Sequence, residues 1–136
     1  TYSIPLAIAS SVALEAYLSD TDIRAKLKKH LMEFISEQIG DVDIASTENG
    51  LSKYLSCSFA NVESDRLLLE LEQLGFAVDS GSACKSADMQ PSHVLAAMGR
   101  PIVGNIRLTL HKDITEKMVV EFCQALKISV EKLRKN

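Results

Sequence analysis

Apolar positions in the first third of the chain form two helical patterns of different kinds. Residues Ile4 to Leu18 are mostly apolar and rich in alanine, and Pro5 lies near the start, where a helix tolerates proline. This pattern predicts a largely buried helix, because apolar residues occur on all of its sides. From Asp22 to Ile39 apolar residues recur at steps of three and four, which predicts an amphipathic helix that Gly40 ends.

The middle of the chain alternates between strand patterns and a helical one. Val42 to Ile44 and Tyr54 to Phe59 are typical of two short strands, which could pair through the loop between them. Ser64 to Leu74 predicts a leucine-rich helix, and Phe76 to Val78 predicts a short strand after it. Helical and extended segments therefore interleave in this region.

The last third continues this order. Pro91 to Met98 predicts a helix that Gly99 stops, and Ile106 to Leu110 alternates as a strand does. Thr115 is expected to open a final amphipathic helix. Its expected apolar face comprises Met118, Val119, Phe122, Leu126, Ile128 and Leu133. The whole pattern favours the α/β (α+β) class, as a two-layer sandwich with a small, mainly antiparallel sheet covered by helices.

Composition and charge narrow the possible functions. With 136 residues, 46% of them hydrophobic, the chain can bury one core, so residues 1–136 are expected to form a single domain. The net charge of -3 and the scattered basic residues argue against a nucleic-acid partner. No apolar run approaches the roughly 20 residues that cross a bilayer, so no membrane partner is expected. Three cysteines, an odd number, do not suggest a disulfide framework and favour a reducing compartment, with the cytoplasm expected.

Cys84 is the strongest candidate for chemistry. It lies among small and polar residues in Asp79 to Ser86, directly after a strand-like run, and Gly81 frees the backbone to turn. Such a loop has little apolar area to dock, so we expect it to be mobile. A thiol has a pKa of about 8.5, and the neighbouring Lys85 would favour the thiolate, which is the nucleophile. The residues alone leave two alternatives open, a reactive thiol and a chance surface cysteine.

The other cysteines and the histidines indicate no further site. Cys57 on a predicted strand and Cys123 on a predicted helix are typical of core thiols. The histidines lie far apart and lack metal-ligand spacing, so no metal site is expected. They are His30, His93 and His111.

Several ordered blocks of the sequence carry a resemblance to a known family. The blocks are Thr1 to Pro5, Leu55 to Phe59, Ser64 to Leu74, Gly75 to Cys84, Pro91 to Gly99 and Ile106 to Leu110. At these blocks, which span essentially the whole chain, the sequence resembles the C-terminal part of cysteine desulfurases. These enzymes belong to the class V aminotransferases and use pyridoxal phosphate. The resemblance implies the small domain of a fold type I pyridoxal phosphate enzyme.

The resemblance also implies roles for three residues. Cys84 matches the loop cysteine that takes sulfur from L-cysteine as a persulfide, yields L-alanine and passes the sulfur to an acceptor or iron–sulfur scaffold protein. Arg107 matches the arginine that binds the substrate carboxylate; the alternative is an edge-strand arginine in a surface ion pair. Thr1 matches a threonine that contacts the cofactor phosphate of the partner subunit, which implies a homodimer of the full-length protein.

The family's cofactor-binding motifs are missing from this sequence. In the family a lysine, a histidine and an aspartate of the large domain hold pyridoxal phosphate, and no segment here resembles those motifs. We therefore expect residues 1–136 to be the C-terminal small domain, to bind no pyridoxal phosphate alone and to be inactive alone. Two alternatives remain: a noncatalytic sulfur-relay or interaction module, and a selenocysteine lyase or another class V aminotransferase relative.

Overall fold

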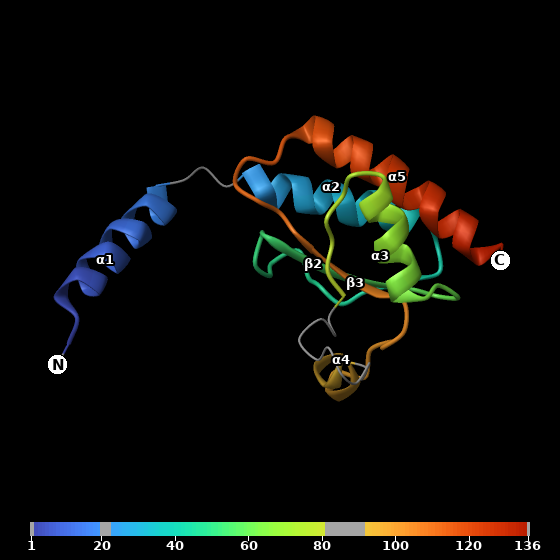
Figure 1. The fold of residues 1–136 in the computed structure, drawn as a ribbon, viewed down its shortest axis with the longest axis horizontal. Helices are drawn as coiled ribbons and strands as arrows, with labels where there is room; N and C mark the ends of the chain where they lie inside the picture. Colours follow the sequence, from blue (N-terminus) through green and yellow to red (C-terminus); the bar gives the residue numbers. More distant parts are fainter. Residues whose placement is uncertain (1, 20–22, 81–91, 136) are drawn as a thin grey trace.

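A three-stranded antiparallel sheet lies at the centre of the computed structural model, which describes residues 2–19, 23–80 and 92–135 (Figure 1). The strands lie in the order β1-β2-β3. Their bounds are β1 Val42–Ile44, β2 Tyr54–Phe59 and β3 Asn105–Thr109. The register places Ile44 opposite Cys57 and Cys57 opposite Ile106. The α/β class, the mainly antiparallel sheet and the pairing of the first two strands are thus confirmed.

Three helices cover one face of this sheet. They are α2 (Ile23–Gln38), α3 (Ser64–Gln73) and α5 (Glu116–Arg134), and Figure 1 shows α2 and α5 side by side over the strands. Alternate strand residues point to this face. Leu55, Cys57 and Ile106 are fully buried there. The core also takes one apolar stripe from each helix, so burial of these stripes against the sheet holds the two layers together.

The final helix begins where the sequence predicts but presents a slightly different face. The Thr115 hydroxyl accepts a hydrogen bond from the Met118 amide at 3.3 Å and so caps the helix. Met118 and Ile128 are 49% and 63% exposed, so their expected place in the apolar face was wrong. Val130, which the expected face omitted, is fully buried.

The first helix forms as predicted but is not buried. α1 (Ile4–Ser19) stands apart from the sheet in Figure 1. The apolar side chains of residues 4–17 are exposed on all sides of the helix, with Ile4 70% and Leu14 58% exposed. The expected burial was therefore wrong for the chain as described, because no other described element packs over this helix.

Two further segments differ from the sequence prediction. Phe76 to Val78 form no strand: the backbone pairs with β3 only at Asp79, through an isolated bridge to Arg107. Phe76 and Val78 instead use their side chains to pack against the core. The helix predicted from Pro91 is shorter, since α4 spans His93–Ala97 and Pro91 lies outside the described residues.

Two cationic side chains connect distant parts of the chain. Lys28 is only 2% exposed, and its ammonium donates hydrogen bonds to the Thr47 and Leu51 carbonyls at 2.7 and 3.1 Å. At the end of α5, the Arg134 guanidinium donates to four backbone carbonyls near the end of α2 and of β2. These are the carbonyls of Ile39, Gly40, Asp41 and Ala60. The cation also lies where the dipole of α2 favours positive charge.

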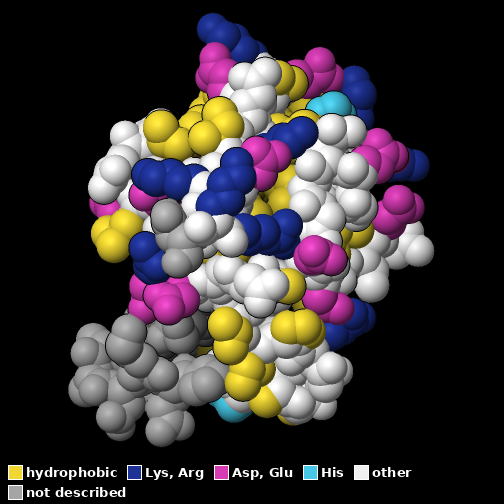
Figure 2. All heavy atoms as spheres, turned by 90° about the vertical axis from the view of Figure 1, so that its right-hand side faces the viewer, with side chains coloured by type: hydrophobic (Ala, Val, Ile, Leu, Met, Phe, Trp, Pro, Cys, Tyr) yellow, Lys and Arg dark blue, Asp and Glu magenta, His cyan; other side chains and the backbone are white. Residues whose placement is uncertain are grey.

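The described surface shows no strongly charged region on the face drawn in Figure 2. Lys and Arg side chains are interspersed there with Asp and Glu, and apolar side chains form small groups between them. Across the described residues, no helix combines the length and the apolar character that a membrane span requires. The face drawn in Figure 2 therefore carries both signs of charge.

Candidate functional site

The face of the sheet opposite the three helices carries polar side chains. Along β3, Ile106 and Leu108 point to the core, so Asn105, Arg107 and Thr109 point the other way. Ser58 of β2 lies opposite Asn105, and Asp43 of β1 lies opposite Ser58. The strand alternation thus gathers hydroxyl, amide, carboxylate and guanidinium groups on one face.

Arg107 is held beside Asp79 on this polar face. The two backbones form a bridge, with the Arg107 amide donating to the Asp79 carbonyl at 2.6 Å and the Asp79 amide donating to the Arg107 carbonyl at 3.2 Å. The Arg107 Nη2 also donates to Asp79 Oδ2, which makes an ion pair. The two side chains are 49% and 33% exposed, so the pair is reachable from solvent.

The Arg107 guanidinium keeps hydrogen-bond donors beyond this ion pair. Within the described residues its one hydrogen-bonded partner is Asp79, through Nη2 alone. A guanidinium has five N–H groups in a planar fork. When one N–H of Nη2 is engaged, one edge with two parallel N–H groups remains, and such an edge matches a carboxylate. The geometry therefore permits Arg107 to bind a second carboxylate.

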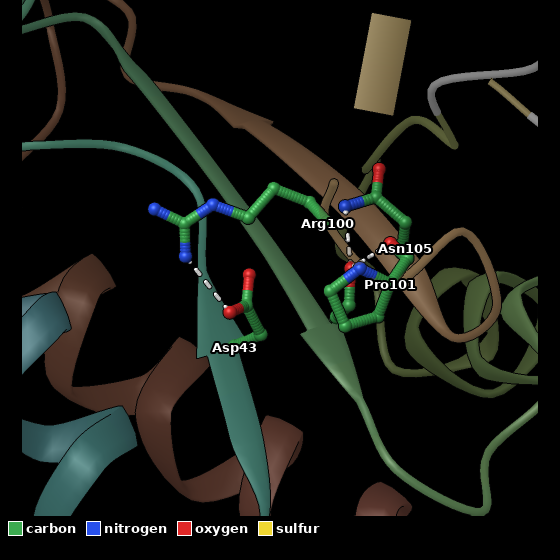
Figure 3. Close-up of polar contacts among 5 residues, drawn as sticks. Asp43, Arg100, Pro101 and Asn105 are labelled. Carbon is green, nitrogen blue, oxygen red and sulfur yellow. Dashed lines mark hydrogen bonds and ion pairs between the residues drawn. The ribbon is translucent and has the colours of Figure 1, made fainter. Parts of the chain in front are cut away.

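Asn105, two residues before Arg107, fixes the position of β3 on the polar face. Its side-chain amide donates to Ser56 Oγ, the Cys57 carbonyl and Ser58 Oγ at 3.1, 3.2 and 3.0 Å. Ser58 Oγ in turn donates to the Pro101 carbonyl at 3.0 Å (Figure 3). Asn105 is 4% exposed and Ser58 3%. This buried network ties β3 to β2 and to the segment before β3.

A second arginine–aspartate pair lies on the same sheet. Arg100 Nη1 donates to Asp43 Oδ2 at 2.9 Å, and Figure 3 shows the guanidinium reaching across to β1. The side chains are 40% and 29% exposed. This pair joins the segment after α4 to β1, and it provides a matched comparison for the pair of Arg107 and Asp79.

The structure places only one of the three predicted site residues. Arg107 lies on β3, which is an edge strand of the sheet except for the single bridge to Asp79. Arg107 forms a surface ion pair, and this is the arrangement expected if it were an ordinary edge-strand arginine. Cys84, its neighbour Lys85 and Thr1 lie outside the described residues. The expected mobility of the Cys84 loop lies outside them too. Within the described ranges, no group of three His, Cys, Asp or Glu side chains could hold a metal ion.

The sequence analysis missed Asp79 as a site residue. Asp79 was visible as the last residue before Ser80 and Gly81, but nothing in a single sequence pairs it with a residue 28 positions later. The pairing depends on the sheet, because the bridge sets the two residues side by side.

The two described cysteines are core thiols, as predicted. Cys57 and Cys123 are 0% and 2% exposed and form no disulfide. Burial raises the pKa of the Cys57 thiol to about 12 and that of the Cys123 thiol to about 11. Both therefore stay protonated and unreactive near neutral pH.

The described residues do not fit pyridoxal phosphate. A Schiff-base site needs a lysine beside a pocket with groups for the phosphate and the pyridine ring. The buried Lys28 is committed to two backbone carbonyls. A hollow of about 280 Å³ is lined mainly by apolar side chains such as Leu31, Phe76 and Phe122, with no lysine or arginine. Lys28 and this hollow therefore do not form a Schiff-base site.

Comparison with known proteins identifies the family. The family model for aminotransferase class V matches residues 1–122. The chain belongs to this family. The cysteine desulfurase IscS of Dictyoglomus turgidum is 35% identical over 113 residues, which is 80% of this chain and 29% of that protein. The cysteine desulfurase of Trichormus azollae is 30% identical over 142 residues, covering 98% of this chain and 36% of that protein.

A solved structure shares the fold of this chain. A NifS-like protein superposes with a TM-score of 0.71 at 26% identity, over 89% of this chain and 30% of that protein. The chain thus spans about a third of the length of the curated relatives it matches. The family model and these relatives agree on the class V aminotransferase family.

Proposed function

We propose that this chain is the sulfur-carrying C-terminal small domain of a pyridoxal phosphate dependent cysteine desulfurase. The observation that carries the proposal is the similarity to curated cysteine desulfurases over 80% and 98% of the chain. The Ser-Gly-Ser-Ala-Cys string that ends at Cys84 supports it from the sequence. The full-length enzyme would be a cytoplasmic homodimer, and the chain alone would be inactive.

Cys84 is the proposed sulfur acceptor. Overall, L-cysteine and the Cys84 thiol give L-alanine and a Cys84 persulfide: the carbon–sulfur bond of the substrate breaks and a sulfur–sulfur bond forms at Cys84. Pyridoxal phosphate, held outside this chain, supplies the electron sink for that cleavage. Thr1 would contact the cofactor phosphate across the dimer. The persulfide then passes its outer sulfur to an acceptor, such as an iron–sulfur scaffold protein.

Arg107 is the proposed anchor for the substrate carboxylate. Two parallel N–H groups of its guanidinium remain for that carboxylate beside the ion pair to Asp79. The strand register and the Asn105 network fix the backbone from which Arg107 extends. Arg107 therefore binds and orients the substrate, and Cys84 performs the sulfur transfer.

Intact-mass analysis after addition of L-cysteine and pyridoxal phosphate tests the proposal. The complete encoded polypeptide should gain one sulfur atom, and the 136-residue chain alone should gain none. Cys84→Ala should abolish the gain, whereas Cys57→Ala should retain it because the Cys57 thiol is buried and protonated. Absence of the gain from the complete polypeptide would reject the desulfurase and favour a noncatalytic module.

A further inference from the structure

Asp79 faces the guanidinium to which the substrate carboxylate is proposed to bind. Within the described residues it forms the one ion pair of Arg107. The backbone bridge, with N···O distances of 2.6 and 3.2 Å, fixes Asp79 directly opposite Arg107 on the neighbouring segment. The Asp79 carboxylate therefore has the same chemistry as the proposed ligand and is already in place.

We propose that Asp79 is an internal competitor that weakens carboxylate binding at Arg107. This inference rests on the proposed role of Arg107 in the desulfurase. An arriving carboxylate either displaces Asp79 from Nη2 or occupies the remaining edge of the fork beside a second negative charge. Both routes lower its affinity, because the guanidinium charge is already largely balanced. Asp79 thus lowers the affinity of Arg107 for carboxylates without acting on the reacting atoms.

The opposite effect, in which Asp79 helps by orienting Arg107, is the weaker one here. Ion pairs between exposed side chains contribute little, because solvent screens them and ordering long side chains has an entropic cost. Arg107 is 49% exposed in this pair, so orientation by Asp79 gains little. Solvent also screens the repulsion between two carboxylates that share one guanidinium, but this repulsion acts at contact distance and has no ordering cost, so it outweighs the gain from orientation.

Competition by Asp79 would keep weakly binding carboxylates from filling the site. A simple carboxylate has only Arg107 to bind, and Asp79 offsets much of that attraction. A substrate with further contacts elsewhere in the enzyme can tolerate the offset, since its binding does not depend on the carboxylate alone. We therefore expect Asp79 to keep small organic acids from occupying Arg107.

Steady-state kinetics of the full-length, cofactor-loaded enzyme test this inference. Two values are measured: the KM for L-cysteine, and the competitive inhibition constant of propionate, a carboxylate that lacks an amino group. Asp79→Asn, which removes the charge at constant size, should lower both by about three- to tenfold with kcat little changed. Asp79→Glu keeps the charge and should stay near the wild type. Asp79→Ser is the second neutral variant if Asn prevents folding.

Asp43→Asn is the matched control. It neutralises the carboxylate of the other exposed arginine–aspartate pair on the sheet and should leave both constants unchanged. Arg107→Lys should raise both constants and so separates the two proposals. If Arg107→Lys raises them but Asp79→Asn leaves them equal or higher, competition is rejected and the role of Arg107 stands. If Arg107→Lys changes neither, the role of Arg107 fails, and the competition with it.

Discussion

Strand β3 separates two environments that hold the molecule in different ways. Toward the helices, Ile106 and Leu108 lie in an apolar core with exposed fractions of 0% and 5%. Toward the other face, Asn105 is buried in a hydrogen-bond network and Arg107 is half-exposed in an ion pair. The first environment contributes stability through burial. In the second, the half-exposed Arg107 can exchange polar partners, so residues one position apart can serve the fold and the site separately.

Truncation on the core side of β3 should have the largest effect on stability. Ile106→Ala removes a fully buried side chain and should lower the free energy of unfolding by about 2–5 kcal/mol. Thr109→Ala on the exposed side of the same strand is the control and should change it by less than about 0.5 kcal/mol. Urea unfolding measures both, and equal losses would contradict the division between the two faces.

Loss of the buried network on the polar face should have the second-largest effect on stability. Asn105→Ala removes the donor that three oxygen atoms share and should cost about 1–3 kcal/mol. Asn105→Asp keeps the size but turns an acceptor toward those oxygens, so it should be more destabilising than alanine. Thermal unfolding of the two variants distinguishes hydrogen bonding from simple loss of volume; a milder effect of Asp would favour volume.

The core thiols should make the protein sensitive to alkali. Because burial raises the folded-state pKa of Cys57 to about 12 and of Cys123 to about 11, the unfolded chain releases these protons first as the pH rises past the ordinary value. Stability is therefore fully present below about pH 9 and falls above it, by about 1 kcal/mol per pH unit for each thiol. Urea unfolding between pH 8 and 10 measures the slope, which the double variant Cys57→Ala, Cys123→Ala should reduce.

The smallest effect on stability should come from the candidate site itself. Arg107→Ala breaks a half-exposed ion pair and should change the free energy of unfolding by less than about 0.5 kcal/mol. The same substitution should raise the KM for L-cysteine in the full-length enzyme. A loss of stability comparable to that of Ile106→Ala would mean that Arg107 belongs to the framework of the fold.

Local periodicity predicted the helices and the strands where burial follows a simple repeat. It failed where packing depends on distant parts of the chain. Ile128 lies two residues after Leu126, about 200° around the helix, so it faces solvent although both residues are apolar. The apolar residues of α1 predicted burial, but no described element covers that helix.

The candidate site was predictable only in part. Family resemblance pointed to Cys84, Arg107 and Thr1, and the structure describes Arg107 alone of the three. The Asp79 partner could not be found from sequence, because an ion pair across 28 residues requires the strand arrangement. The Asn105 network has the same origin, since its three acceptors lie on the neighbouring strand 47–49 residues earlier.

The position of Arg134 has a consequence for synthesis. Its guanidinium donates hydrogen bonds to backbone carbonyls that follow α2 and β2. The helix that carries it, α5, completes the cover of the sheet. A ribosome-bound chain that has emerged only as far as β3 would therefore lack α5, and the apolar residues that α5 covers would be exposed. The core is complete only when α5 is free to dock, so the exposed apolar residues are a natural target for chaperones acting on the nascent chain.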